Sequence, residues 1–299
     1  MRVFLTGANG YIGGAAAVAL VAAGHEVRGL VRDKAKAATV AAHGVEAVVG
    51  SLDDPALLRD EARAADAVVN AASSDHRGAV EALLTGLAGS GKAFIHSSGS
   101  SIVADLAMGE PSDRIFHEGE TLVPVADKAA RVAIDRLVLQ APGIRAAVLC
   151  NTMIYGHALG PPAQSVQIPA LTRQAQASGV ARYIGRGLNR WSNVHIADAA
   201  VLYVLVIEML AIEKAPAHTF MYVESGEEGL REIADAIARR LGLGAAQSWS
   251  AAEAIAVWGR NMAVYSLGSN SRVRGSAAAA LGWSPKRRSI TDWIADELV

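Results

Sequence analysis

A glycine-rich turn near the N-terminus has the residue types and spacing of a phosphate-binding loop. The apolar segment Arg2–Thr6 is followed directly by Gly7, Gly10 and Gly13, and then by an alanine-rich segment. Gly7 permits a tight exit from a strand, Gly10 lets the backbone approach a pyrophosphate, and Gly13 lets a helix pack closely. We therefore expect a dinucleotide to bind at the start of this helix, with an ordinary strand–turn–helix as the alternative. The other residues of the predicted loop are Asn9, Tyr11 and Ile12.

The residues after the next two predicted strands bear on which dinucleotide binds. NAD-selective sites usually have an acid at the end of the second strand, where it holds the ribose hydroxyls. Arg32 stands at that place here, and a guanidinium matches a 2′-phosphate. We therefore expect NADP; the alternative is NAD, with Arg32 as a solvated loop charge and Asp33 holding the ribose. Leu52 and Asp53 follow the third strand and are expected near the adenine, although Asp53 has helix capping as an alternative role.

The elements that would position these residues alternate between strand and helix patterns. Strands are predicted over short apolar segments at 2–6, 26–31, 46–49, 67–70, 93–96 and 145–150. Helical patterns separate them at 12–23, 34–42, 77–89 and 125–140, and a further helix starts at Asp54-Pro55. This alternation predicts an α/β fold with a doubly wound parallel sheet of the Rossmann type.

Beyond residue 150 the alternation is less regular. A loop containing Pro161-Pro162 leads to helical patterns and short strands; the helices are predicted near 170–178, 197–213, 230–241 and 251–258, and the strands near 181–184 and 220–223. We expect residues 1–150 to form a dinucleotide-binding Rossmann domain and residues 151–299 to form a smaller, mixed substrate lobe packed on it. The boundary between the two is soft, because no linker composition marks it.

Composition and charge exclude several classes of function. The chain has 299 residues, 52% of them apolar and 19% charged, with a formal net charge of -1. This balance provides no basic surface, so neither nucleic acid nor a membrane is expected as a partner. Cys150 is the only cysteine, which excludes an internal disulfide and a cysteine metal cluster and favours the reducing cytoplasm. The scattered histidines form no metal-ligand motif, so no metal is expected.

Two uncharged stretches resemble membrane segments in composition only. Residues 7–24 contain the glycine turn, and residues 146–172 contain Pro161, Pro162 and Pro169. These residues would interrupt a spanning helix. A cleaved leader is not expected either, because its removal would destroy the first strand and its glycine turn. We therefore expect a soluble, cytoplasmic protein.

Further segments, together with the glycine turn, make the chain resemble a known family. They are Val69–Ala72 after the fourth strand, Phe94–Gly99 at the fifth, Ile154–Gly156 after the sixth, Trp191–Asp198 and Leu281–Pro285. The chain resembles the short-chain dehydrogenase/reductase superfamily, in its extended or atypical branch of epimerase/dehydratase-like proteins. The resemblance implies further cofactor-binding residues, namely Asn70, Ala71, Ala72, Ser97 and Lys128. In the substrate-lobe signature, His195 is expected to join lobe and sheet, and Asp198 to cap the following helix.

The family's catalytic positions are where this chain departs from the pattern. The family uses a tyrosine, a lysine four residues later that lowers the pKa of the phenol, and an assisting serine. When Lys128 is aligned with that lysine, Pro124 takes the tyrosine position and Gly99 takes the serine position. The remaining catalytic candidates are Lys128, Ser98, Ser100 and Tyr155. Tyr155 would be a substitute acid, its alternative being a loop aromatic with a satisfied hydroxyl, and Lys128 has a solvated helix lysine as its alternative.

Three functions follow from this combination of an intact cofactor turn and altered catalytic positions. The first is an NAD(P)-dependent oxidoreductase acting on a small carbonyl, imine or enone compound. The second is a sugar-nucleotide epimerase or dehydratase, which the missing phenol disfavours. The third is a redox sensor that binds NADP without turnover. A homodimer through the helices at 77–89 and 125–140 is compatible with all three, although those helices also need apolar faces to cover the sheet.

Overall fold

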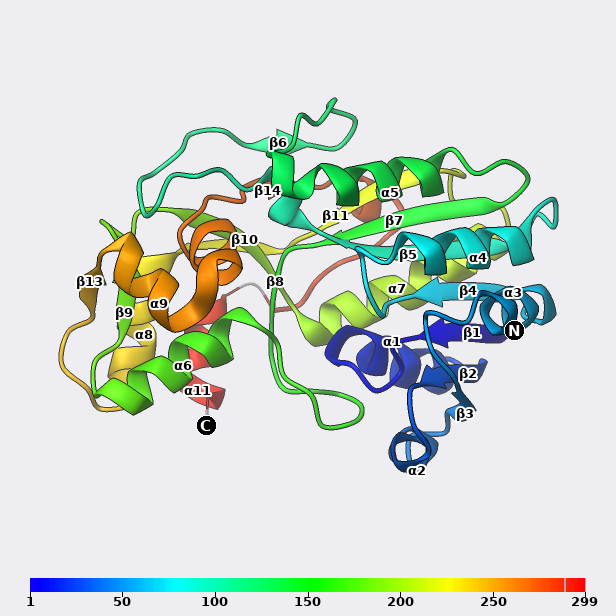
Figure 1. The fold of residues 1–299 in the computed structure, drawn as a ribbon, viewed down its shortest axis with the longest axis horizontal. Coiled ribbons are helices and arrows are strands. Elements are labelled where there is room, and N and C mark those ends of the chain that lie inside the picture. Colours follow the sequence, from blue (N-terminus) through cyan, green and yellow to red (C-terminus); the bar gives the residue numbers. More distant parts are fainter. Residues whose placement is uncertain (288, 299) are drawn as a thin grey trace.

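A seven-stranded parallel sheet is the largest element of the computed structural model, which describes residues 1–287 and 289–298 (Figure 1). Its strands are β1 (Arg2–Thr6), β2 (Glu26–Val31), β3 (Glu46–Val49), β4 (Ala67–Asn70), β5 (Ala93–Gly99), β7 (Arg145–Asn151) and β11 (Thr219–Val223). Their order in space is β11-β7-β5-β4-β1-β2-β3, and every pairing is parallel. The order runs outward from β1 in both directions, which confirms the predicted doubly wound sheet.

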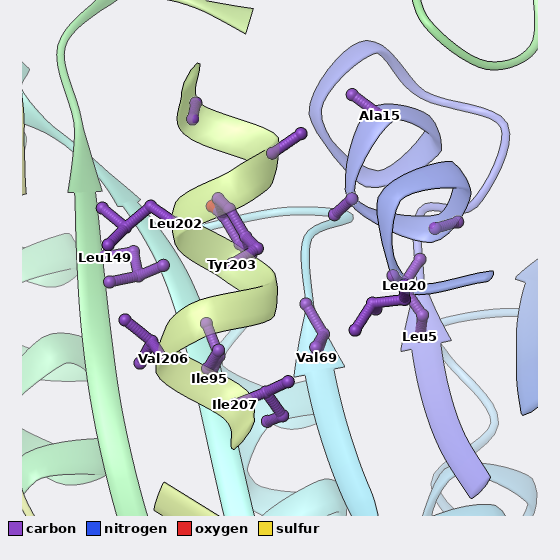
Figure 2. Close-up of a cluster of buried hydrophobic side chains, with 14 of the residues drawn as sticks. Leu5, Ala15, Leu20, Val69, Ile95, Leu149, Leu202, Tyr203, Val206 and Ile207 are labelled. Atoms are coloured by element: carbon purple, nitrogen blue, oxygen red, sulfur yellow. The ribbon is translucent and has the colours of Figure 1, made fainter. Parts of the chain in front are cut away.

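Helices cover both faces of this sheet. One face is covered by α1 (Tyr11–Ala22), α2 (Lys34–Ala41) and α7 (Ile196–Ala211), the other by α3 (Pro55–Ala64), α4 (Arg77–Leu87) and α5 (Ala129–Leu139). Side chains alternate along each strand, so in β1 Val3 and Leu5 enter the first core while Phe4 enters the second. Figure 2 shows the first core, in which α7 lies over the sheet beside α1; among its residues are Leu5, Leu20, Val69, Ile95, Leu149, Tyr203 and Val206.

The rest of the chain forms a smaller lobe with its own core. Its helices are α6 (Gln167–Ser178), α8 (Leu230–Arg240), α9 (Ala251–Met262) and α11 (Ile290–Glu297). They surround the strands β8 (Met153–Tyr155), β10 (Arg190–His195) and β12 (Gly226–Gly229), and the pair β9 (Arg182–Ile184) and β13 (Gln247–Trp249). Residues 151–299 do not all lie here, because α7 and β11 return to the large sheet.

Shorter elements complete the connections. They are 3₁₀ turns at Ser100–Val103 and Ala126–Lys128, a π-helical segment at Ala263–Leu267, the short strands β6 (Phe116–His117) and β14 (Val273–Arg274), and α10 (Ala277–Ala280). The helix predicted over 125–140 is therefore wrong at its start, where a 3₁₀ turn precedes the α-helix, as is frequent at helix termini. In the described part of the chain, no helix combines the length and apolarity needed to cross a membrane.

Candidate cofactor and substrate site

The glycine turn leaves no space for side chains at two of its positions. Gly7 has φ of +78°, and a Cβ atom there would lie 2.8 Å from the carbonyl oxygen of Ala71. A Cβ atom on Gly13 would lie 2.2 Å from the carbonyl oxygen of Gly7. The start of α1 is thus pressed against the end of β1, and its N-cap, Gly10, has no side chain to bond the first N–H groups. Those groups are available to an anion.

A cavity of about 450 Å³ extends from this turn to the smaller lobe. Eight of the residues predicted for the site line it: Gly10, Tyr11, Ile12, Ala71, Ala72, Ser98, Ser100 and Lys128. The other predicted residues lie outside this lining: Gly7, Asn9, Gly13, Arg32, Leu52, Asp53, Asn70, Ser97 and Tyr155. The structure therefore brings the turn, the end of β5 and the start of α5 together around one space, which has the volume of a typical ligand pocket.

The smaller lobe closes the cavity over the glycine turn. The phenol of Tyr11 donates a hydrogen bond to the carbonyl oxygen of Gly156 at 2.8 Å, which ties α1 to the loop after β8. Burial raises the pKa of Tyr11 well above its usual range, so this phenol stays protonated. Trp191 lines the cavity from β10, while its Nε1 donates to the carbonyl oxygen of Ser269 at 2.8 Å.

Two charged residues directly after β2, Arg32 and Asp33, are the candidates for binding the adenosine ribose. Arg32 is exposed directly after β2. Asp33 is the N-cap of α2, and its Oδ1 accepts from the backbone N–H of Lys36 at 2.9 Å. Asp33 thus has a structural task, whereas Arg32 makes no side-chain hydrogen bond or ion pair with any described residue.

After β3, the two candidate adenine contacts have different surroundings. Leu52 packs against the apolar core on the α3 side of the sheet. Asp53 is exposed and accepts a hydrogen bond from His76 Nε2 at 3.0 Å, and this bond lowers the pKa of its carboxyl. Asp54, not Asp53, caps α3 by accepting from the N–H of Leu57. The alternative role of Asp53 as a helix cap is therefore wrong.

Two predicted cofactor residues have side chains that are occupied in the interior. Asn70 Oδ1 accepts from the hydroxyl of Thr6 at 2.6 Å, and its amide nitrogen lies 3.0 Å from His96 Nδ1. Ser97 Oγ lies 2.7 Å from the hydroxyl of Tyr203 on α7. Asn70 thus links β4 to the neighbouring strands β1 and β5, and Ser97 links β5 to α7. Any contact of these residues with a cofactor would therefore have to come from their backbone.

Tyr155 does not reach the cavity. Its ring is fully buried in the smaller lobe, 5.2 Å from the ring of His195 and 5.9 Å from that of Trp293. Burial raises the pKa of its phenol above the usual range, and the hydroxyl has no hydrogen-bond partner among the described residues. The preceding residue, Ile154, lines the cavity instead, because successive side chains of a strand point to opposite sides.

We expect Tyr155→Phe to leave any turnover that depends on a nicotinamide dinucleotide within about twofold of the wild type. The change removes only a hydroxyl without a partner, and such a removal is nearly neutral or stabilising. Steady-state rates with NADPH and thermal unfolding of both proteins would test this. A loss of turnover with the unfolding temperature unchanged would restore Tyr155 as a candidate acid.

The substrate-lobe signature is mainly structural. His195 caps α7 by accepting from the N–H of Ala197 at 3.1 Å. The prediction that Asp198 caps this helix is wrong, because Asp198 lies inside its first turn and accepts from the N–H of Arg287 at 2.9 Å. Asn193 donates to the buried carboxylate of Glu228. The signature thus joins β10, α7 and the C-terminal segment.

Lys128 lies at the wall of the cavity, immediately before α5. Its Nζ donates to Asn261 Oδ1 at 3.3 Å and lies 5.0 Å from the ring centre of Tyr265. Burial, and then the nearby Arg131, lower the pKa of this ammonium. The alternative of a solvated helix lysine is wrong, since Lys128 is 7% exposed.

Arg131, which no sequence motif indicated, lies beside Gly99, the position that aligns with the missing serine. It lines the cavity, and a Cβ atom on Gly99 would lie 3.4 Å from its Nη1. Its Nε donates to Asp75 Oδ1 at 2.8 Å, and its Nη1 donates to Ser101 Oγ at 3.0 Å. The guanidinium also holds the pKa of Asp75 below its usual range. The sequence spacing could have indicated Arg131 as a site residue, because residues three apart on a helix share a face and Lys128 precedes Arg131 by three.

Comparison with known proteins agrees with this fold and turn. A family profile described as "NAD dependent epimerase/dehydratase family" matches residues 3–219. "Oxidase ucsJ" of Acremonium sp is 34% identical over 95% of this chain and 92% of its own length. A "4-hydroxy-2-methyl-3-oxo-4-farnesyl-3,4-dihydroquinoline-1-oxide ketoreductase" of Stigmatella aurantiaca is 28% identical over 76% of this chain and 69% of its own.

Among solved structures, the fold is similar to that of DesIV, a dTDP-glucose 4,6-dehydratase from Streptomyces venezuelae with NAD and TYD bound. The TM-score is 0.74 at 22% identity, and the match covers 100% of this chain and 96% of that one. These matches confirm the predicted resemblance to the extended short-chain dehydrogenase/reductases. The chain belongs to the NAD dependent epimerase/dehydratase family.

Proposed function

We propose that this protein is an NADP-dependent oxidoreductase that reduces a small carbonyl compound. The observation that carries the proposal is the guanidinium of Arg131, which lines a cavity that begins at a glycine turn and lies beside Gly99, the position that aligns with the helper serine. A Cβ atom at Gly7 or Gly13 would clash with backbone atoms of the protein, so only glycine permits this tight turn between β1 and α1. Such a turn is typical of dinucleotide-binding sites. Arg32 suits the 2′-phosphate of NADP at the end of β2.

The chemistry that the reduced nicotinamide supplies when bound is a hydride, transferred with its electron pair to the carbonyl carbon. Arg131 would donate to the carbonyl oxygen and stabilise the negative charge that develops on it, as preorganised donors do in other enzymes. Its pair with Asp75 fixes the plane of the guanidinium. Lys128, held beside the cavity, would bind the hydroxyls of the nicotinamide ribose.

Carbonyl reduction fits this arrangement better than sugar epimerisation or dehydration. Those two reactions require a well-placed proton acceptor next to the nicotinamide, and the family position for it is Pro124 in this chain. The relatives named as an oxidase and as a ketoreductase support redox chemistry, and the name of the ketoreductase gives a dihydroquinoline oxide as its compound. The proposed substrate is therefore a small carbonyl-like molecule.

Incubation of the purified protein with NADPH and a panel of aldehydes, ketones, quinones and imines tests this function. Nicotinamide absorbance would report turnover, and a titration would report cofactor affinity. We expect oxidation of NADPH with at least one carbonyl compound. Tight NADPH binding without turnover across the panel would favour a redox sensor, and conversion of a sugar nucleotide without net oxidation would favour an epimerase.

Arg32→Ala is expected to weaken NADPH binding by about 10-fold to 100-fold and to leave NADH binding unchanged. A hydrogen bond to a charged group contributes about 1.5–3 kcal/mol, and only NADPH has the 2′-phosphate that Arg32 would bind. The measurement is the dissociation constant of each dinucleotide. The control is Lys34→Ala, which removes a neighbouring exposed cation at the start of α2. Equal losses for both dinucleotides would exclude a 2′-phosphate contact.

A further inference from the structure

A buried row of polar groups leads away from the cavity beneath Arg131. Ser98 lines the cavity, and its Oγ lies 2.8 Å from Asp135 Oδ2 on α5. Oδ1 of Asp135 and Nε2 of His96 face each other at 3.6 Å, and neither has a hydrogen-bond partner within the described residues. Asp135 is only 3% exposed. A buried carboxyl with one unpartnered oxygen is costly when charged, so a specific task for it is a reasonable inference.

The surroundings of Asp135 favour its protonated form. Burial raises the pKa of Asp135 to about 7, and the hydrogen bond with Ser98 and the charge of Arg131 limit this rise. The other groups that face it are His96 on β5, Asp75 before α4, Cys150 on β7 and Tyr222 on β11. Burial lowers the pKa of His96 to about 4, so this imidazole is neutral at pH 7. Burial also raises the pKa of the Cys150 thiol.

A second cavity reaches Asp135 from another direction. It has a volume of about 250 Å³, and Asp135 is among the residues that line it. The same lining includes the exposed residues His117, Thr121 and Arg136, so this cavity opens towards solvent. Asp135 thus stands between the surface and Ser98, which itself borders the substrate cavity.

We propose that Ser98 donates the proton to the substrate oxygen and that Asp135 reprotonates Ser98 with a proton drawn from the second cavity. The inference rests on the proposed carbonyl reduction, with a reduced nicotinamide dinucleotide as co-reactant. Arg131 stabilises the oxygen but does not supply this proton, because a guanidinium stays protonated in proteins. Ser98 is then the catalytic residue, and Asp135 is a positioning residue that acts through it.

The carbonyl carbon accepts a hydride with the electron pair of a C–H bond that breaks in the reduced dinucleotide. The π pair of the C=O bond moves to the oxygen, which takes the proton of Ser98 Oγ. The Oδ2–H bond of Asp135 breaks as its proton moves to Ser98 Oγ across the 2.8 Å contact. Asp135 is left as a carboxylate and recovers a proton from water in the second cavity.

The two phenols that line the substrate cavity are less suited to this task. The proton of Tyr11 is engaged by the carbonyl oxygen of Gly156. The hydroxyl of Tyr265 lies 3.5 Å from Arg260 Nη2, and Lys128 approaches the face of its ring. Lys128 therefore does not place its ammonium at the hydroxyl of Tyr265, whereas the family mechanism requires a lysine that lowers the pKa of the phenol.

The pH dependence of reduction tests the relay. In the wild type we expect kcat to fall as pH rises through about 7, because Asp135 then loses the proton that it must supply. Asp135→Asn should lower kcat on the order of 10²-fold and abolish this fall. Ser98→Ala should do the same, and Ser98→Thr, which keeps a hydroxyl, should retain most of the rate. Asp60→Asn on the exposed side of α3 is the matched control.

Three outcomes in these assays would overturn the relay. One is an unchanged rate and pH profile in Asp135→Asn. Another is loss of the alkaline fall in Tyr265→Phe with its retention in Asp135→Asn, which would assign the proton to Tyr265. A merely structural role of Asp135 predicts a lower unfolding temperature with the pH profile kept, and this too would refute the proposal.

Infrared spectroscopy gives a second readout that needs no turnover. We expect a carboxylic acid C=O band in the wild type at slightly acidic pH, absent in Asp135→Asn, that titrates near pH 7 and shifts promptly in D₂O. Absence of the band, or a band that resists D₂O for hours, would refute proton passage through Asp135. Failure to reduce any compound in the panel, with the infrared result as expected, would instead refute the proposed function. The two failures are thus distinguishable.

Discussion

Arg131→Met is expected to lower kcat/KM for carbonyl reduction by about 10²–10³-fold, with the affinity for NADPH nearly unchanged. The loss of one preorganised donor to a developing oxyanion has this magnitude in other enzymes. Arg131 lies against Gly99, at the active-site end of β5, whereas the glycine turn that would hold the phosphates belongs to β1 and α1. The effect should therefore fall on the chemical step. Methionine keeps much of the length of the side chain without its charge.

Stability is not expected to account for that loss. The side chain of Asp75, the partner of Arg131, is 59% exposed, so water replaces the guanidinium when it is removed. Thermal unfolding of the variant should differ little from that of the wild type. Arg77→Met, which removes the exposed cation of an ion pair with Glu81 on α4, is the control for a lost surface charge. Equal rates in Arg131→Met and the wild type would refute the assigned role.

Arg131→Lys separates charge from geometry. Lysine keeps a cation but lacks the planar fork that bonds Asp75 and Ser101 together. We expect a rate between those of the wild type and Arg131→Met. A rate equal to that of Arg131→Met would indicate that the two-sided hydrogen bonding, and not the charge, matters most.

The features that local sequence determines were predicted correctly. The glycine turn requires a positive φ at Gly7 and close backbone contact at Gly13, and no larger residue satisfies both. Spacing along a few residues therefore identifies it. The central strands β1, β4 and β5 are short apolar segments buried on both faces, and the alternation of strands with helices is visible in the chain itself.

The catalytic side chains could not be predicted in the same way, because their positions depend on packing between distant segments. Arg131 becomes a candidate only when α5 lies against the end of β5, so that its guanidinium comes beside Gly99 at the wall of the cavity. Asp135 becomes one only when the same helix sets its carboxyl beside Ser98. In each of these contacts, the two residues are more than thirty positions apart in the sequence.

Two of the predicted residues that do not line the cavity, Tyr155 and Ser97, are explained by one physical rule. Ile154 and Tyr155 are neighbours in β8, yet Ile154 lines the cavity and Tyr155 enters the core of the smaller lobe. Ser97 and Ser98 are neighbours in β5, yet Ser97 bonds Tyr203 on α7 and Ser98 bonds Asp135 on α5. Neighbouring strand residues point to opposite faces, so an error of one residue in register reverses the prediction.

Gly13→Ala is expected to raise the dissociation constant for NADPH by at least 10²-fold. The new Cβ atom would lie 2.2 Å from the carbonyl oxygen of Gly7 and 2.8 Å from its carbonyl carbon. These are backbone atoms, so the turn or α1 must move to relieve the contact. Either movement displaces the N–H groups at the start of α1 that would bind the phosphates, and those groups bind only in the right orientation.

Gly78→Ala is the matched control for that change, because Gly78 also lies in the first turn of a helix. A Cβ atom there would come no closer than 3.8 Å to any other group, the nearest being His76. Alanine should therefore stabilise α4 slightly, by about 0.5–1 kcal/mol, and leave NADPH binding unchanged. Calorimetric titration of both variants, with thermal unfolding, separates lost binding from lost folding. Wild-type affinity in a folded Gly13→Ala protein would show that the glycine turn does not bind the dinucleotide, and the cofactor proposal would fall with it.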